Sequence, residues 1–255
     1  MSAVSVRSVV VCLKPLLTRT LYREGTVRTI LRGPARGLRY RLYVAGRAPL
    51  YGGWEPSEQR LMAQHIRPGM VAYDIGANHG IHTLLMARLV GSEGHVYAFE
   101  PVPENTLELR ANLGLNQFSN VTVLETAVCD TAGVAYFDRG TDHCSGHLKL
   151  RRERSNQFPV VTRSLDEFVF GEGHRPPAFI KVDVEGAESR VLSGAAKAIA
   201  TYRPILLIAL HGPVQQMAVG QILSELSYRS YHADDGKEGL AEEIIAMPEG
   251  YSFQQ

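Results

Sequence analysis

Residues 70–80 read Met70-Val71-Ala72-Tyr73-Asp74-Ile75-Gly76-Ala77-Asn78-His79-Gly80, an apolar run that leads into a glycine-rich segment. A second apolar run, His95-Val96-Tyr97-Ala98-Phe99, ends at Glu100. A strand that runs into a Gly-rich turn and then a helix brings backbone N–H groups close to a ligand. An acidic residue about 20 positions further on can accept hydrogen bonds from ribose hydroxyls. The stretch therefore predicts a nucleotide-cofactor site.

Asp74 decides between the possible cofactors. A carboxylate at the mouth of the loop repels the pyrophosphate of a dinucleotide but suits an ammonium group, which S-adenosylmethionine carries. The segment from Gly76 to Gly80 also lacks the G-x-G-x-x-G spacing that lets a backbone approach pyrophosphate. S-adenosylmethionine is therefore the expected cofactor, and a dehydrogenase is disfavoured.

Strand and helix signals alternate along the rest of the chain. The expected strands cover residues 71–75, 96–99, 121–125, 178–182 and 205–210, and the expected helices cover 79–89, 104–113, 187–200 and 214–226. Short strands at 133–137 and 160–162 border a long polar loop, and the last strand candidates are 229–232 and 243–247. Such alternation indicates an α/β fold with a parallel sheet and helices on both faces.

The first 50 residues differ from the remainder in charge. They hold ten of the 27 Lys and Arg residues but one of the 26 acids, Glu24. Apolar residues from Val6 to Leu21 recur at helical spacing, and residues 38–44 suggest a short strand. We expect a basic N-terminal arm at 1–50 and a cofactor-binding domain at 51–255. The arm's alternatives are peripheral membrane contact, self-association into a homo-oligomer, or packing on its own acidic domain.

Composition narrows the protein class. A chain of 255 residues with 45% hydrophobic content suits one α/β domain plus an appendage. No apolar run reaches the roughly 18 to 20 residues needed to span a bilayer, and we expect a cytoplasmic protein. The three cysteines form no C-x-x-C pair. The pairs His79 with His82 and His143 with His147 lack an evident third ligand, so we expect solvated histidines and no metal site.

Several segments together resemble the FkbM-type S-adenosylmethionine-dependent methyltransferase family. The matching pieces are the loop at 74–80, Phe99-Glu100-Pro101, residues 127–130, residues 164–168 and above all Ile180-Lys181-Val182-Asp183-Val184-Glu185-Gly186-Ala187-Glu188. They occur in the family's order and cover roughly residues 51–250. The resemblance implies a class I methyltransferase fold, a Rossmann-like, mostly parallel seven-stranded sheet with helices on both faces, here with the N-terminal helical arm added.

The same resemblance implies a set of cofactor contacts. The loop, with Gly76, Asn78 and Gly80, lies under the methionine portion, and Asp74 helps to hold its ammonium directly or through water. Glu100 accepts both ribose hydroxyls. Ala127 and Val128 line the adenine face, and Asp130 is a candidate partner of the adenine amino group.

The catalytic candidates follow two buried strands. Asp183 and Glu185 come after residues 178–182, and His211 follows residues 205–210, so all three belong to the carboxyl edge of the sheet. Asp183 is a candidate base, orienting group or partner of the sulfonium. Glu185 either binds substrate or caps the following helix, and His211 is an alternative base or a structural histidine. Many relatives carry an acid where this chain has Ala209.

The expected function is O-methylation of a hydroxyl on a small molecule or sugar, a substrate class that the resemblance supplies. The alternatives are a non-catalytic S-adenosylmethionine-binding scaffold and a methyltransferase acting on protein or nucleic acid. Nucleic acid is disfavoured because the N-P-P-Y type signature of amino-group methylation is absent, and because the arm lacks interleaved aromatic residues for base stacking.

Overall fold

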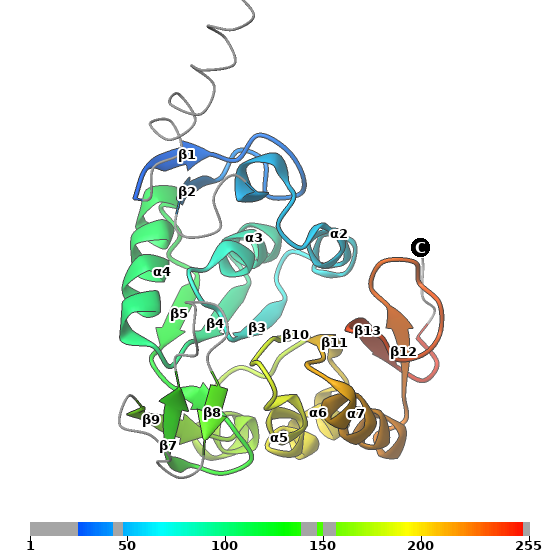
Figure 1. Cartoon of the computed structure of the whole chain (residues 1–255). Helices are drawn as coiled ribbons and strands as arrows, with labels where there is room; N and C mark the ends of the chain where they lie inside the picture. Colours follow the sequence, from blue (N-terminus) through cyan, green and yellow to red (C-terminus); the bar gives the residue numbers. More distant parts are fainter. Residues whose placement is uncertain (1–24, 43–47, 139–146, 150–156, 252–255) are drawn as a thin grey trace, which may run out of the picture.

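A seven-stranded sheet forms the centre of the molecule, seen in a computed structural model that describes residues 25–42, 48–138, 147–149 and 157–251 (Figure 1). Its spatial order is β12-β13-β11-β10-β3-β4-β5. Five neighbouring strands, β11, β10, β3, β4 and β5, run parallel, and β13 pairs antiparallel with both β11 and β12. The strands are β3 (Val71–Ile75), β4 (His95–Phe99), β5 (Val121–Leu124), β10 (Phe179–Val182), β11 (Ile205–Ala209), β12 (Tyr228–His232) and β13 (Glu243–Pro248). This arrangement confirms the expected class I methyltransferase sheet.

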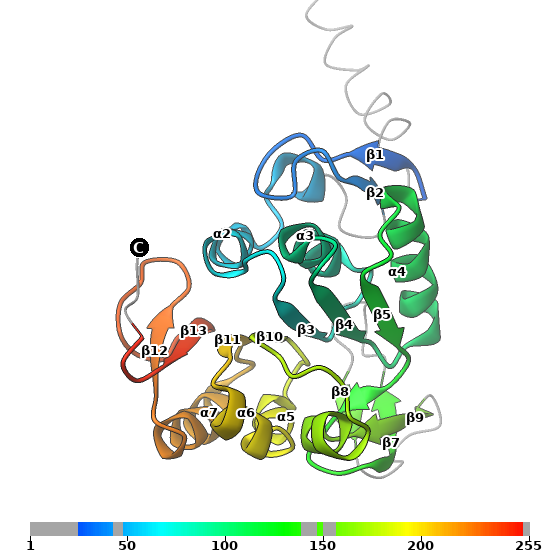
Figure 2. The same cartoon turned by 180° about the vertical axis from the view of Figure 1, so that it is seen from behind.

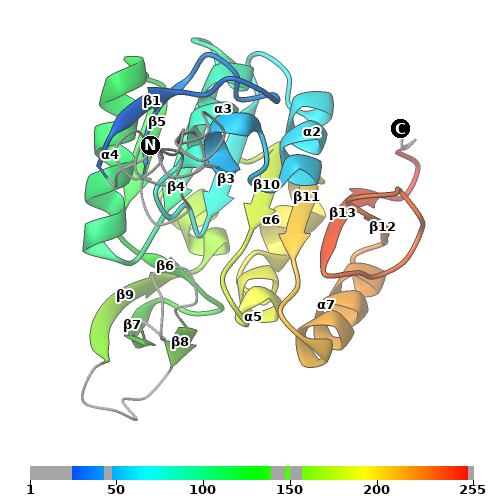
Figure 3. The same ribbon diagram turned by 45° about the horizontal axis from the view of Figure 1, so that its top comes forward.

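Helices cover both faces of this sheet (Figures 1 and 2). One layer contains α2 (Pro56–His65), α3 (Ile81–Val90) and α4 (Pro103–Asn116), and the other contains α5 (Glu188–Ser193), α6 (Ala196–Tyr202) and α7 (Pro213–Glu225). Side chains of a strand alternate between the faces. Ala72 accordingly packs with the α2 and α3 side chains, whereas Tyr73 packs with those of α5 to α7. Figure 3 shows the strands in this order between the two layers.

The helix expected at 187–200 is two helices. The prediction of a single element was wrong because the chain bends at Gly194, between α5 and α6. A Cβ atom at Gly194 would lie 2.1 Å from the carbonyl oxygen of Cys129. The close approach of a distant backbone therefore sets the break, and helical periodicity carries no sign of such a contact.

Residues 25–42, from the second half of the expected arm, pack against the domain, which was one of the alternatives for the arm. β1 (Val27–Thr29) and β2 (Arg39–Arg41) make an antiparallel hairpin, and the backbone N–H of Arg41 donates to Asn112 of α4 at 2.8 Å. Ile30 and Tyr40 are buried in one cluster with Leu84 of α3. The packing continues across the boundary expected at residue 50. The helix expected near residues 6–21 lies outside the described residues.

A small second sheet follows β5, in the order β6-β9-β7-β8. Its strands are β6 (Ala127–Val128), β7 (Gly133–Asp138), β8 (His147–Lys149) and β9 (Phe158–Arg163), and residues 167–171 then form one turn of π-helix. Most of the polar loop expected at 138–157, with His143, lies outside the described residues. None of the helices in the described ranges combines the length and the apolar character needed to cross a bilayer.

Candidate functional site

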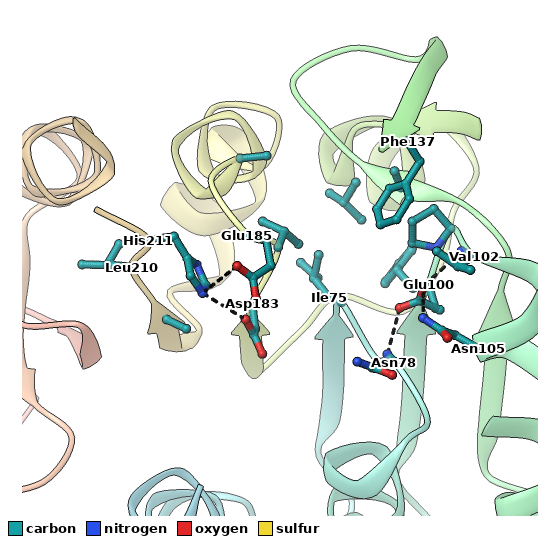
Figure 4. A pocket seen from close by; sticks show the side chains of 18 of the residues that line it. Ile75, Asn78, Glu100, Val102, Asn105, Phe137, Asp183, Glu185, Leu210 and His211 are labelled. Atoms are coloured by element: carbon teal, nitrogen blue, oxygen red, sulfur yellow. Dashed lines mark hydrogen bonds and ion pairs between the residues drawn. The ribbon is translucent and has the colours of Figure 1, made fainter. Parts of the chain in front are cut away.

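A cavity of about 540 Å³ opens at the carboxyl ends of the parallel strands. It is lined by Gly76 after β3, Glu100 after β4, Asp183 after β10 and His211 after β11. The strand order reverses between β3 and β10, and open α/β sheets bind ligands at such a switch point. Figure 4 shows two groups of polar side chains, with Asp183, Glu185 and His211 on one side and Glu100 and Asn105 on the other.

The glycine loop is shaped by close packing against the neighbouring strand. Gly76 has φ +81°, and a Cβ atom there would lie 1.8 Å from the carbonyl oxygen of Asp183. Gly80 has φ +86°, and its Cβ would lie 2.0 Å from a methyl carbon of Leu109. Both positions therefore require glycine, as the sequence suggested. Between them Asn78 lines the cavity, and its side-chain oxygen Oδ1 is buried without a hydrogen-bond partner.

Glu100 is held in place by three hydrogen bonds. Its Oε2 accepts from the backbone N–H of Asn78 at 2.8 Å, and its Oε1 accepts from the backbone N–H of Val102 at 3.0 Å and from Asn105 Nδ2 at 3.1 Å (Figure 4). The side chain lines the cavity although the residue is only 4% exposed. Burial raises the pKa of Glu100 to about 7, and the hydrogen bonds oppose this rise. A preorganised carboxylate thus faces the cavity.

Apolar residues line the wall beyond Glu100. Ala127 and Val128 of β6 line it, and Phe137 of β7, from the same small sheet, joins them (Figure 4). Asp130 differs from the expectation, because it is not among the cavity-lining residues. Its carboxylate forms an ion pair with the guanidinium of Arg190 on α5, at 2.6 and 3.2 Å. A contact between Asp130 and adenine would have to compete with this ion pair, and it stays a prediction.

Asp74 lies behind the cavity wall. It is fully buried, accepts a hydrogen bond from the Thr83 hydroxyl at 2.5 Å, and lies 3.9 Å from Lys181 Nζ. Burial raises the pKa of Asp74, and Lys181 and Thr83 oppose the rise. Asp74 is not among the residues that line the cavity. A role of Asp74 toward the cofactor ammonium, which we expected directly or through water, stays a prediction.

Asp183, Glu185 and His211 come together as expected. His211 Nε2 lies 3.4 Å from Glu185 Oε2 and 3.9 Å from Asp183 Oδ1 (Figure 4). Lys181 donates to Asp183 Oδ2 at 3.1 Å. Burial raises the pKa of Asp183, but the charge and the hydrogen bond of Lys181, with a contribution from His211, together outweigh this rise, and the pKa is lowered. Asp183 is therefore held as a carboxylate.

Glu188 is a site residue that the sequence did not single out. It is fully buried, and its Oε1 lies 2.6 Å from His211 Nδ1 and accepts from the backbone N–H of Gly186 at 2.9 Å. The Glu188 carboxylate raises the pKa of His211. It also leaves Nε2 as the ring nitrogen that faces Asp183 and Glu185. A Glu at the start of a helix is usually explained by its favourable interaction with the helix dipole, so the sequence offered no reason to assign Glu188 a role in the site.

Two clusters at the cavity have the spacing of metal ligands. Asp183, Glu185 and His211 form one, and Glu55, Glu58 and His82 form the other, with the ligand atoms of each within 4.8 Å of one another. His79 and His82 were expected to be solvated, and this was wrong, since they are 9% and 4% exposed. The cluster joins His82 to Glu58 of α2 and to Glu55 before it, and His79 is not part of it. That no metal is needed remains a prediction.

Backbone strain gathers around the same cavity. Glu55, Asn78 and Glu185 line it and adopt left-handed φ values of 44°, 48° and 51°. For a residue other than glycine this conformation costs on the order of 1 kcal/mol or more and persists where surrounding structure enforces it. Such outliers are typical of binding sites, and here they coincide with the polar side chains of the cavity.

Known proteins resemble this chain over more than half of its length. Residues 74–233 match the family model described as the methyltransferase FkbM domain. The chain is 29% identical over 166 residues to the hexuronic acid methyltransferase AglP of Haloferax volcanii, covering 65% of this chain and 66% of AglP. It is 25% identical over 218 residues to the 31-O-demethyl-FK506 methyltransferase FkbM of Streptomyces tacrolimicus, covering 74% of each. It is 26% identical over 153 residues to the 2-O-methyltransferase NoeI of Sinorhizobium fredii, covering 54% of this chain and 62% of NoeI. The matches thus span just under two thirds of AglP and of NoeI.

Proposed function

Because the chain belongs to the FkbM methyltransferase family, we propose that it transfers a methyl group from S-adenosylmethionine to an oxygen of a sugar or other small molecule. The observation that carries this proposal is the position of Glu100 and His211 on opposite sides of one cavity. Glu100, on one side, can accept hydrogen bonds from the ribose hydroxyls of the cofactor. His211, on the other side, can act as a base.

The cavity fits the proposed cofactor in three respects. Glu100 presents a carboxylate for the two ribose hydroxyls, and Asn78 contributes a buried oxygen that lacks a partner. The wall formed by Ala127, Val128 and Phe137 suits the adenine ring. When bound, S-adenosylmethionine supplies a methyl group on a positively charged sulfur.

His211 is the residue best suited to take the proton of the acceptor hydroxyl. Glu188 fixes the ring, so the proton is accepted at Nε2. A base is most effective when its pKa lies near the working pH. Glu188 raises the pKa of His211 above its ordinary 6.5, whereas Lys181 lowers that of Asp183. Asp183 is thus the weaker base, and its carboxylate orients the hydroxyl and the protonated ring.

The acceptor class rests on the relatives. AglP is named for hexuronic acid, the Streptomyces enzyme for an O-demethylated FK506, and NoeI for 2-O-methylation. Oxygen is thus the methylated atom in the names of the Streptomyces enzyme and of NoeI, and a sugar acid is the acceptor in the name of AglP. The carboxylates Glu185, Glu242 and Glu243 line this cavity, and together with His211 they offer hydrogen-bond acceptors suited to a polyhydroxylated substrate.

The test begins with calorimetric titration of S-adenosylhomocysteine and, as a contrast, NAD. Methyl transfer to a panel of neutral and uronic sugars is then followed by mass spectrometry. His211→Asn and Asp183→Asn should each lower turnover, His211→Asn by about 10²- to 10⁴-fold, while S-adenosylhomocysteine affinity is kept. His232→Asn, a change at a histidine outside the cavity, is the matched control. Absence of nucleoside binding would refute the function, and binding without transfer to any acceptor would favour a scaffold.

A further inference from the structure

The cavity has a recess beside the glycine loop that the proposed chemistry does not yet use. Trp54, Glu55, Gly76, Asn78 and Asp183 line both the recess and the main cavity, so the two spaces adjoin. His82 lines the recess, and Glu58 lines the main cavity. Glu55 lies just before α2, and Glu58 lies in its first turn. Both precede the glycine loop in sequence but lie next to it in space.

Two buried polar atoms where the recess meets the main cavity lack a hydrogen bond. Glu58 is 2% exposed and His82 4% exposed, and Oε2 of Glu58 and Nε2 of His82 are both buried without a hydrogen bond. His82 Nε2 lies 3.3 Å from Glu55 Oε2, and Nδ1 lies 3.7 Å from Glu58 Oε2. A buried polar group without a partner costs about 1–3 kcal/mol, so such a cluster points to a missing ligand.

The recess is surrounded by more acidic than basic side chains, which favours the binding of a cation. Carboxylates from four elements influence one another here: Glu55, Glu58, Asp74, Asp183 and Glu243. The Lys181 ammonium lies 3.1 Å from Asp183 and 3.9 Å from Asp74, so it is already paired with these two carboxylates. Burial lowers the pKa of His82 to about 3, so the ring is neutral. Burial also raises the pKa of Glu55 to about 7, because the neighbouring carboxylates add to the effect of burial and the Lys181 charge opposes it only in part.

We propose that Glu55 and Glu58, with the neutral ring of His82, bind the ammonium group of the methionine portion of the cofactor. An ammonium donates three hydrogen bonds, and the three residues offer acceptor atoms within 4.8 Å of one another. This assignment rests on the proposed function. It transfers to Glu55 and Glu58 the role that the sequence had suggested for Asp74, which lies behind the wall.

The left-handed backbone at Glu55 fits this role. With φ 44°, Glu55 precedes the first residue of α2 in a position where its side chain makes no capping hydrogen bond. An acid at this place in a helix would ordinarily cap the backbone N–H groups. Here the carboxylate is 30% exposed and lies beside His82 at the recess instead. The strained turn therefore directs the acid toward the cavity.

The experiment compares three nucleosides on the full chain by calorimetric titration. S-adenosylhomocysteine carries the ammonium, its deaminated analogue lacks it, and 5'-methylthioadenosine lacks the whole amino-acid portion. Glu55→Gln and Glu58→Gln should each weaken S-adenosylhomocysteine binding by about 10- to 150-fold, the range for a hydrogen bond to a charged group. Both variants should bind 5'-methylthioadenosine within about twofold of the wild type. Glu108→Gln, on α4 and paired with Arg41 at 3.3 Å, is the matched control.

Each outcome has a distinct meaning. If the wild type binds none of the nucleosides, the proposed function itself fails. If the wild type binds S-adenosylhomocysteine and its deaminated analogue equally, the ammonium has no partner and the present inference is wrong. That comparison needs no substitution, so it holds even if a variant fails to fold. A Glu55-dependent binding of Mn²⁺ with unchanged S-adenosylhomocysteine affinity in Glu55→Gln would identify a metal site and overturn the proposal.

Discussion

Replacing Glu100 with glutamine should weaken nucleoside binding and remove its pH dependence. The relevant ligand is 5'-methylthioadenosine, because it carries the ribose hydroxyls but no ammonium. Glu100 contributes an ionised acceptor, and a hydrogen bond to a charged group is worth about 1.5–3 kcal/mol. At about pH 8.5 we therefore expect Glu100→Gln to bind about 10- to 150-fold more weakly than the wild type.

The sign of the pH effect follows from burial. The pKa of Glu100 is raised to about 7, so the ionised form is complete well above pH 7 and declines below it. Because the hydroxyls select the ionised form, wild-type affinity should fall by about tenfold per pH unit below pH 7 and stay flat above pH 8. Glu100→Gln should show no such fall. Calorimetry between about pH 5.5 and 9 measures both proteins, and a wild-type affinity independent of pH over that range would refute the reasoning.

Three further outcomes are expected. Gly76→Ala should abolish cofactor binding and lower the free energy of unfolding in urea by more than about 2 kcal/mol, because its Cβ would overlap a neighbouring carbonyl oxygen; a stable variant that binds normally would contradict the close packing. Glu188→Gln should lower the pKa of His211, so the acidic limb of the turnover profile should move to lower pH; an unmoved limb would exclude His211 as the titrating base. Asp130→Asn should leave nucleoside affinity unchanged and cost at most about 1 kcal/mol of stability, because its partly exposed carboxylate pairs with Arg190; a loss of affinity would restore Asp130 to the adenine site.

The central sheet could be predicted because its signals are local. Apolar runs bounded by glycine, proline or an acid located β3, β4, β10 and β11 to within about a residue. The resemblance added the class I methyltransferase fold with its mostly parallel seven-stranded sheet. What could not be predicted are features set by contacts between distant segments. The break at Gly194 depends on the backbone of Cys129, and helical periodicity holds no trace of it.

In the site, too, features with local sequence signals could be predicted, and features set by contacts between distant segments could not. Glu100 and His211 follow strands, so their position at the sheet edge could be inferred from the sequence alone. Glu188 was missed because its role appears only when β11 brings His211 next to it. Glu55 and Glu58 were missed because two acids at the start of a helix normally serve its dipole. The burial of Asp74 behind the cavity wall could not be predicted, because spacing gives the position of a residue along the strand but not its depth.

The hairpin β1–β2 lies outside the segment that matches the family model, but it is part of the unit that folds. The family match begins at residue 74, whereas the buried cluster that contains Leu84 and Leu109 is completed by Ile30, Tyr40 and Leu42. A fragment cut at the start of the match would expose these apolar side chains of α3 and α4 to water and invite aggregation. A catalytic domain that is exchanged between relatives of this chain must therefore include the hairpin as well as the glycine loop. The family match alone would not indicate this, because it does not cover the hairpin.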